Sequence, residues 1–163
     1  MSSDNELYLR NIIFGVSDSL VSTVGLLAGI DVSGTTRQVI LLTGIIYAFV
    51  EAFSMAVGSF LSEQSAEEYE AKGEVVNNKA IVAGIVMFIS FVLAAFIPIL
   101  PYVLFGPSIA IWVSIILSIA TLFVLGLVSA RLVRVKMIEH AVKMAILGGS
   151  AILIGVIVGR FVK

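Results

Sequence analysis

The sequence predicts an all-α integral membrane protein with about five transmembrane helices and a cytoplasmic N-terminus. Hydrophobic residues make up 60% of the chain, and charged residues only 13%. Residues 80–130 contain no Asp, Glu, Lys, Arg or His, and uncharged apolar runs of about 18 residues or more are typical of membrane-spanning helices. Such helices satisfy their own backbone hydrogen bonds, as the interior of a bilayer requires.

The bounds of each crossing follow from the polar or helix-breaking residues beside it. The second crossing is expected to continue as a helix into the cytoplasm to about residue 76, because no Gly or Pro interrupts residues 62–72. The third is expected to end before Pro98 and Pro101, since a proline removes a helical donor and clashes with the preceding turn. The expected crossings are residues 9–30, 38–61, 80–97, 108–130 and 142–158, within a single domain over residues 1–163.

The distribution of Lys and Arg predicts the orientation in the membrane. Four basic residues lie between the fourth and fifth crossings: Arg131, Arg134, Lys136 and Lys143. Under the positive-inside rule, this loop is cytoplasmic. With five crossings, the N-terminus is then cytoplasmic and the C-terminus lies outside.

Composition argues against several classes of function. The formal net charge is −1 and no basic excess is present, so no nucleic-acid partner is expected. The chain has no cysteine, and therefore no thiolate metal site and no Cys nucleophile. The single histidine, His140, lies at the membrane edge. An enzyme is thus the least favoured class, and no bound cofactor is expected.

Two acidic residues, Asp18 and Glu51, fall near the middle of predicted crossings. A charge at that depth costs about 3 kcal/mol on insertion scales, and residues in such positions commonly mark ion or proton routes. Two simpler interpretations stay open. In the first, Asp18 is a buried acid that is hydrogen-bonded to Ser17 or Ser22. In the second, Glu51 is a protonated carboxyl group that packs between helices.

Polar and sulfur-containing side chains extend the Glu51 face toward the cytoplasm. Met55 lies four residues from Glu51 and shares its helix face, and Ser59 and Ser62 continue that face. Carboxylates suit hard and borderline divalent cations, and a thioether shifts the preference toward softer ones. This set of side chains suits Fe²⁺ or Mn²⁺ better than Na⁺, although packing is the more common role of a methionine.

Four further carboxylates follow the second crossing: Glu63, Glu67, Glu70 and Glu74. Their i, i+4, i+7, i+11 spacing places them on one face of a continued helix. Such a face is either simply solvated or concentrates cations at the mouth of a path.

Two pairs of glycines have the small-xxx-small spacing that lets helices approach closely: Gly25 with Gly29, and Gly155 with Gly159. The sequence allows either a contact between two copies of the chain or a contact within one copy.

Two segments resemble motifs of the vacuolar iron transporter family. Residues 10–29, RNIIFGVSDSLVSTVGLLAG, resemble the first helix of that family, and residues 51–62, EAFSMAVGSFLS, resemble its second-helix motif around Ser-Met-Ala-x-Gly. The resemblance implies a five-helix protomer that forms a homodimer, with the translocation path at the subunit interface. It also implies export of Fe²⁺ and related ions from the cytosol against protons, with Asp18 and Met55 as metal ligands in the membrane.

The chain departs from the family pattern at three places. Ser19 replaces a usual glycine. Ser59 stands where many members have Glu, whereas Glu51 occupies a position that is often small, which displaces the carboxylate by two turns on the same face. Members that bind metal in the cytoplasm have a separate helical domain between the second and third helices, and here only residues 62–79 stand in its place.

These features together predict a multi-pass transporter of Fe²⁺ or Mn²⁺ that resides in the cell membrane of a prokaryote, or in a vacuolar or other organelle membrane of a eukaryote. Its expected partners are the metal ion, protons, the lipid bilayer and a second copy of the chain. Two alternatives are a proton-coupled transporter of another solute and a non-transporting membrane scaffold with the same fold. The expected metal-binding residues are Asp18, Glu51, Met55, Glu63, Glu67, Glu70 and Glu74.

Overall fold

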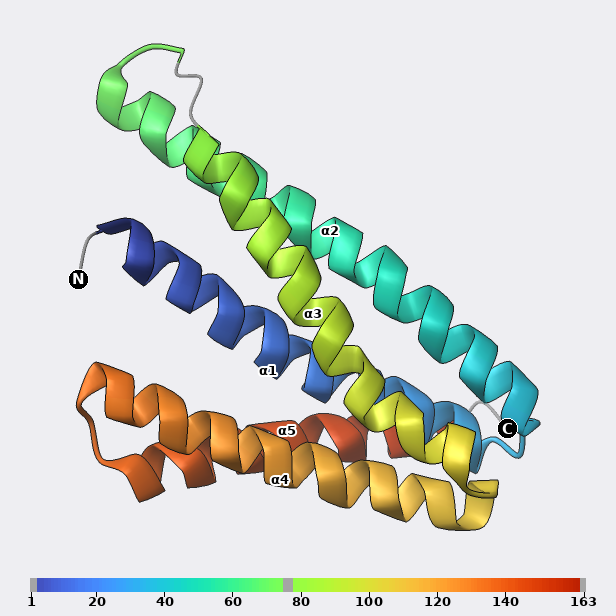
Figure 1. Ribbon diagram of the computed structural model, residues 1–163. Coiled ribbons are helices and arrows are strands. Elements are labelled where there is room, and N and C mark those ends of the chain that lie inside the picture. The colour runs from blue at the N-terminus through green and yellow to red at the C-terminus, as the bar shows by residue number, and fades with distance from the viewer. Residues whose placement is uncertain (1–2, 75–77, 162–163) are drawn as a thin grey trace.

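The computed structural model describes residues 3–74 and 78–161, and the secondary structure of these residues is α-helical (Figure 1). Five helices are long and apolar enough to cross a membrane. They are α1 Ser3–Val32, α2 Arg37–Ala71, α3 Asn78–Leu104, α4 Pro107–Val133 and α5 Met137–Phe161. The predicted all-α fold with five transmembrane helices is confirmed, whereas the side of the membrane on which each end lies stays a prediction.

Helix α1 packs against all four other helices. Helix α3 packs against α1, α2 and α4. Its buried side chains include Phe91, Ile99 and Tyr102. Helices α1 and α2 approach each other at the turn of residues 33–36 and separate toward the other end of the bundle, with α3 crossing both (Figure 1).

The prediction that Pro98 and Pro101 end the third crossing is wrong, because α3 continues through both prolines. Both are buried, and neighbouring helices bind carbonyl oxygens close to them. Ser114 of α4 donates a hydrogen bond of 2.8 Å to the carbonyl oxygen of Pro98. Nε of Arg37 in α2 donates to the carbonyl oxygen of Tyr102 at 2.6 Å. These bonds connect α3 to α4 and to α2 beside the two prolines.

The predicted extension of the second helix to about residue 76 is also wrong. Helix α2 ends at Ala71, and Lys72 adopts the left-handed conformation with φ 53° and ψ 34°. The backbone amides of Lys72 and Gly73 both donate to the carbonyl oxygen of Glu68. This hydrogen-bonded cap closes the helix and places Glu74 beyond its end, and residues 75 and 76 lie outside the described part of the chain.

The two glycine pairs pack against each other where α1 crosses α5. A Cβ atom added to Gly29 would lie 2.7 Å from the carbonyl oxygen of Gly155, and Cβ atoms on Gly155 and Gly159 would overlap the carbonyl oxygens of Gly25 and Gly29. Only glycine permits backbones to approach this closely. The structure thus assigns both pairs to a contact within one chain, which the sequence left undecided.

Candidate functional site

Asp18 of α1 and Glu51 of α2 face the same region between their helices. Both are half-buried, and they lie near enough for their charges to interact. Tyr47, one helical turn from Glu51, has its hydroxyl near Ser22 and near the carboxyl groups of Asp18 and Glu51. Two carboxyl groups and two hydroxyl groups therefore gather between α1 and α2. Oxygen donors of this kind suit hard and borderline divalent cations.

The serines beside Asp18 donate to the main chain. Oγ of Ser22 donates to the backbone carbonyl of Asp18 at 2.7 Å, and Oγ of Ser17 donates to the carbonyl of Phe14 at 3.1 Å. The interpretation in which one of these serines stabilises the Asp18 carboxyl group by donating to it is therefore not supported. The position of the Asp18 carboxyl group at this depth therefore needs another explanation. Glu51 and Tyr47 are the candidate groups with which Asp18 shares a proton or a cation.

Met55 lines a groove of about 680 Å³ on the side of the carboxyl pair toward the N-terminal end of α1. The groove lies between α1, α2 and α3, and Ser62 and Met87 also line it. Met87 is almost fully buried, and its sulfur lies against Gly15 of α1. Two thioethers and several hydroxyls therefore line a space that begins one helical turn from Glu51.

Asn11 fixes the position of Ser59 in the same groove. It is only 4% exposed, and its Nδ2 donates to Oγ of Ser59 at 3.0 Å and to the carbonyl oxygen of Ala83 at 3.2 Å. The amide thereby connects α1, α2 and α3. At residue 59, where the family resemblance leads one to expect Glu, this chain has a hydroxyl held by Asn11, and its carboxylate lies at Glu51 instead.

The acidic residues at the end of α2 line a second cavity of about 520 Å³, which also contains basic residues. Nη2 of Arg10 lies 3.9 Å from Oε2 of Glu63, and Arg10 also lines the Met55 groove. The charged residues of this acidic cavity are Glu6, Arg10, Glu63, Glu67, Glu70 and Lys79.

The prediction that four carboxylates share one face of α2 is wrong for Glu74. Three of them, Glu63, Glu67 and Glu70, line the acidic cavity. Glu74 follows the left-handed cap at Lys72 and is exposed, because the helical spacing that would align it with the others ends at Ala71.

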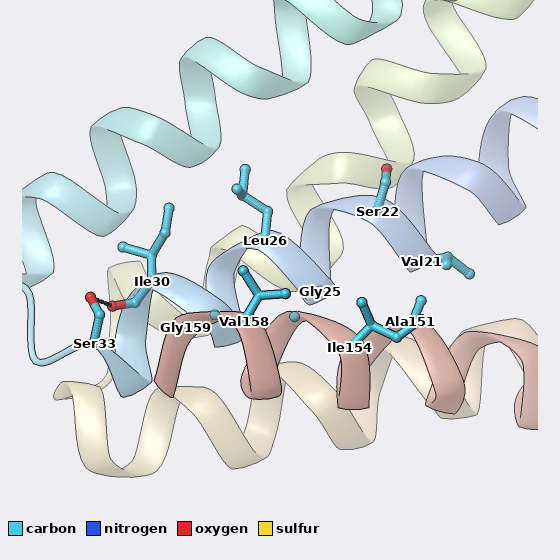
Figure 2. Close-up of a pocket in the computed structure, with 12 residues that line it drawn as sticks. Val21, Ser22, Gly25, Leu26, Ile30, Ser33, Ala151, Ile154, Val158 and Gly159 are labelled. Carbon is cyan, nitrogen blue, oxygen red and sulfur yellow. Dashed lines mark hydrogen bonds between the residues drawn. The ribbon is translucent and has the colours of Figure 1, made fainter. Parts of the chain in front are cut away.

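On the other side of the carboxyl pair, an apolar groove of about 460 Å³ follows α1 and α5 (Figure 2). Ser22 lies at one end of this groove, and Ser33 near the other end donates to the carbonyl oxygen of Ile30 at 2.7 Å. Val158 and Ile154 of α5 form part of its wall. The polar side chains of this region are thus mainly on the Met55 side of the carboxyl pair.

A hydrogen-bond network ties the helix ends at the turn between α1 and α2. Tyr102, which is 1% exposed, donates from its hydroxyl to Oδ2 of Asp31 at 3.1 Å. Arg37 donates to the carbonyl oxygens of Tyr102 and Val103. The network joins α1, α2 and α3 at the end of the bundle opposite to the acidic cavity, and the sequence analysis did not identify it.

Within residues 3–74 and 78–161, no group of three or more His, Cys, Asp or Glu side chains is placed to hold a metal ion. One chain brings together two acidic side chains, Asp18 and Glu51, with Met55 one turn farther along α2.

The model of the VIT family matches residues 9–81 and 72–160, which together cover nearly all of the sequence. The chain belongs to the VIT family. The family resemblance of the first two helices is thereby confirmed, and with five apolar helices this VIT-family chain is a multi-pass membrane protein. The two matches overlap in residues 72–81, at the connection between α2 and α3.

Relatives of this VIT-family chain come from plants and archaea. An uncharacterized protein of Methanocaldococcus jannaschii is 26% identical over 153 residues, which cover 83% of this chain and 80% of that protein. Vacuolar iron transporter 1 of Arabidopsis thaliana is 23% identical over 203 residues, covering 88% of this chain and 81% of the relative. Vacuolar iron transporter homolog 4 of the same plant is 29% identical over 159 residues, which cover 90% of this chain and 80% of that protein. The alignment of 203 residues exceeds the 163 residues of this chain, so that relative has residues without a counterpart here.

Sequence reasoning missed Tyr47 and Asn11. Tyr47 precedes Glu51 by four residues, so helical spacing alone places it on the same face. Asn11 is a polar residue at the start of an apolar run, and such residues inside membrane helices commonly form hydrogen bonds between helices. The sequence pattern therefore points to both residues. Their contacts with Ser22 and Ser59 could not be predicted, because these contacts depend on how α1 packs against α2.

Proposed function

We propose that this VIT-family chain is a transporter that exports Fe²⁺ or Mn²⁺ from the cytosol in exchange for protons. The observation that carries the proposal is the approach of Asp18 and Glu51, from two different helices, within the membrane-spanning region. Relatives named vacuolar iron transporters support a metal ion as the substrate. The transported ion is the substrate of the protein and not a cofactor. The proposed activity is transport and not an enzymatic reaction.

The proposed route begins at the acidic cavity and follows α1 and α2 into the membrane. Glu63, Glu67 and Glu70 attract cations there, and Arg10 and Lys79 limit the net negative charge. The ion then passes the hydroxyls and thioethers of the Met55 groove and reaches the carboxyl pair. This direction requires a cytoplasmic N-terminus, for which the basic residues between α4 and α5 are the support.

We propose that the path is completed by a homodimer. A two-fold axis beside α1 and α2 would bring together two copies each of Asp18, Glu51 and Met55. Six ligands are enough for a divalent transition metal, whereas one chain supplies half of them. Within the described residues, one protomer has no group of three or more His, Cys, Asp or Glu side chains that could hold a metal ion, and in this proposal the second copy supplies the remaining ligands.

The same symmetry gives a physical reason for proton exchange. Four ionised carboxylates close together in a membrane would exceed the charge of one dication, so some are protonated when the metal is absent. An arriving metal ion displaces these protons, which leave on the side from which the metal came, and protons from the opposite side bind again after the metal has left. Metal movement in one direction is thereby coupled to proton movement in the other.

Flux measurements in proteoliposomes test the proposal. The purified chain is reconstituted with an internal metal indicator and an internal pH reporter, and Fe²⁺, Mn²⁺, Zn²⁺, Co²⁺ and Ca²⁺ are compared. We expect Fe²⁺ and Mn²⁺ flux with opposite proton movement. Proton movement driven by another solute, without metal flux, would indicate a transporter of that solute. The absence of any flux with a folded protein would indicate a membrane scaffold.

A further inference from the structure

Two hydroxyl groups deep in the bundle have no hydrogen-bond partner among the described residues: Oγ1 of Thr23 in α1 and Oγ of Ser118 in α4. Both residues are 0% exposed. Burial of a hydroxyl group costs free energy unless it is hydrogen-bonded, and buried polar groups in native proteins usually bind a protein group or an ordered water molecule. Neither residue lines the Met55 groove or the acidic cavity, so the proposed metal route does not account for them.

The register between α1 and α3 places Thr23 beside one particular turn of α3. The two helices run in the same direction (Figure 1). Oγ of Ser19 donates at 2.8 Å to the carbonyl oxygen of Phe91, 72 positions later, and the bond from Asn11 to the main chain of α3 has the same offset. Thr23 follows Ser19 by one helical turn on the same face. The same offset therefore places Thr23 opposite Ala95.

Ser118 faces the same turn of α3 from the other side. Helix α4 runs antiparallel to α3 (Figure 1). Ser114, one turn before Ser118, donates to the carbonyl oxygen of Pro98. Leu122, one turn after Ser118, belongs to one buried cluster with Ala94. Because Ser118 lies between these two contacts on one face of α4, it is opposite the turn from Ala94 to Pro98.

This turn of α3 contains a carbonyl group without its usual helical donor. In an α-helix, the carbonyl oxygen of Ala94 accepts a hydrogen bond from the backbone N–H four residues later. That residue is Pro98, which lies inside α3 and has no N–H group. Ser and Thr side chains and ordered water molecules commonly satisfy carbonyl groups that a proline frees in a membrane helix. Two donors without acceptors and one acceptor without its helical donor thus occur at the same level of three helices.

We propose that Thr23, Ser118 and the carbonyl group of Ala94 bind one buried water molecule between α1, α3 and α4. The two hydroxyls donate to the water, and the water donates to the carbonyl oxygen. Three hydrogen bonds are typical of a buried water molecule. Neither hydroxyl has a direct bond to a carbonyl group in the described structure, so a bridging molecule is needed to satisfy all three groups. None of them carries a charge, which favours water over a cation. This proposal is independent of the substrate and the direction of transport.

Solid-state NMR of the full chain in lipid bilayers detects the water molecule directly. The experiment measures the transfer of proton magnetisation from water to nearby carbon nuclei of the labelled protein. We expect several-fold faster transfer to Ala94 than to Ala28, an equally enclosed alanine that belongs to an apolar cluster of α1 and α5. Ala94 is the decisive residue because its side chain has no exchangeable proton. The double variant Thr23→Val, Ser118→Ala should reduce the transfer to Ala94 to the level of Ala28.

Melting temperatures in detergent test whether the hydroxyls have a partner. Thr23→Val keeps the shape of the side chain and removes its hydroxyl. We expect a decrease of about 2–4 °C, the effect of about one lost hydrogen bond in a chain of this size. A hydroxyl that has no partner predicts the opposite sign, because valine would remove an unsatisfied polar group. Thr121→Val is the matched control, since the Thr121 hydroxyl bonds within α4 to the carbonyl oxygen of Leu117, and its effect should be smaller.

The variant Pro98→Ala tests the part of the carbonyl group. It restores an N–H at residue 98, which can donate to the carbonyl oxygen of Ala94, so this oxygen no longer needs the water. Thr23→Val should therefore lower the melting temperature less in the Pro98→Ala background than in the wild type. Loss of proline packing is common to both proteins of that background and cancels in the comparison.

Three results would overturn the proposal. An increase of the melting temperature in Thr23→Val would show that its hydroxyl has no partner. Equal transfer of magnetisation to Ala94 and Ala28 would exclude a water molecule at this turn, and a lowered melting temperature of Thr23→Val would then indicate a direct bond from the hydroxyl. An equal decrease in the wild-type and Pro98→Ala backgrounds would show that the carbonyl group of Ala94 does not belong to the site.

Discussion

At the residue scale, a carboxylate inside a membrane must be neutralised by a proton, a cation or a basic partner. Asp18 has Glu51 and Tyr47 as its neighbours from α2, and both are acidic groups. Two acids that share a site cannot both keep a full charge without a cation between them. The pair is therefore suited to alternate between bound protons and a bound metal ion.

The variant Asp18→Asn should lower metal flux by at least about tenfold, which corresponds to about 1.4 kcal/mol in the barrier. The amide keeps the shape of the carboxyl group but cannot carry its charge, so the helical content should stay unchanged. Flux in proteoliposomes and circular dichroism measure the two effects. Glu139→Gln, on an exposed side chain that is paired with Lys136 at 3.8 Å, is the matched control. Near-normal flux in Asp18→Asn would remove this residue from the mechanism.

The variant Glu51→Gln should lower the number of protons exchanged per metal ion more than it lowers thermal stability. An amide resembles a protonated carboxyl in shape, so the packing of α2 is retained while one titrating group is lost. The internal pH reporter and the metal indicator together give the ratio. An unchanged ratio with full flux would make Glu51 a packing residue, and the carboxylate at residue 51 would then not replace the one expected at residue 59.

At the scale of the element, the contact between α1 and α5 depends on the absence of side chains. Replacing Gly155 by Ala places a Cβ against the carbonyl oxygen of Gly25, and overpacking of this kind costs about 1–3 kcal/mol. We expect a lower apparent melting temperature in detergent. Gly149→Ala on the same helix meets no atom within 4 Å and should keep or raise the melting temperature, because Ala favours helix formation. Equal melting temperatures for the two variants would contradict the close contact.

The three carboxylates of the acidic cavity should act through their collective charge. Relative to the wild type, the variant with Glu63, Glu67 and Glu70 replaced by Gln should lose more apparent metal affinity at low ionic strength than at high, because salt screens exposed charges beyond about 8–10 Å. Direct ligands would show a loss that depends less on salt. Glu74→Gln is the matched control, since Glu74 lies beyond the end of α2. Unchanged affinity of the triple variant at both salt concentrations would assign these residues to a solvated surface.

At the scale of the whole molecule, the proposed mechanism requires two copies of the chain. Mixing wild-type chains with Asp18→Asn chains before reconstitution distinguishes a shared path from separate paths. If both copies of Asp18 are needed, flux should fall with about the square of the wild-type fraction, because only wild-type dimers remain active. A linear decrease would show that each protomer transports independently, and the dimer-interface path would then be wrong.

The sequence by itself determined the fold class, the family and the pair of acids. Runs of apolar residues specify membrane helices because the backbone has no other partner in lipid, and a charge at mid-depth is conspicuous because it is costly. Helical spacing also predicted that Met55 follows Glu51 on one face. These properties are local, so a single chain segment contains all the information.

Only the tertiary structure decided which helices share a site and where some of them end. Helix α3 continues through Pro98 and Pro101, and Ser114 and Arg37, from other helices, bind carbonyl oxygens near them. The glycine pairs meet within one chain because α1 crosses α5, and Asn11 reaches Ser59 because α1 lies beside α2. Each of these outcomes depends on contacts between residues far apart in sequence, and local pattern carries no information about such contacts.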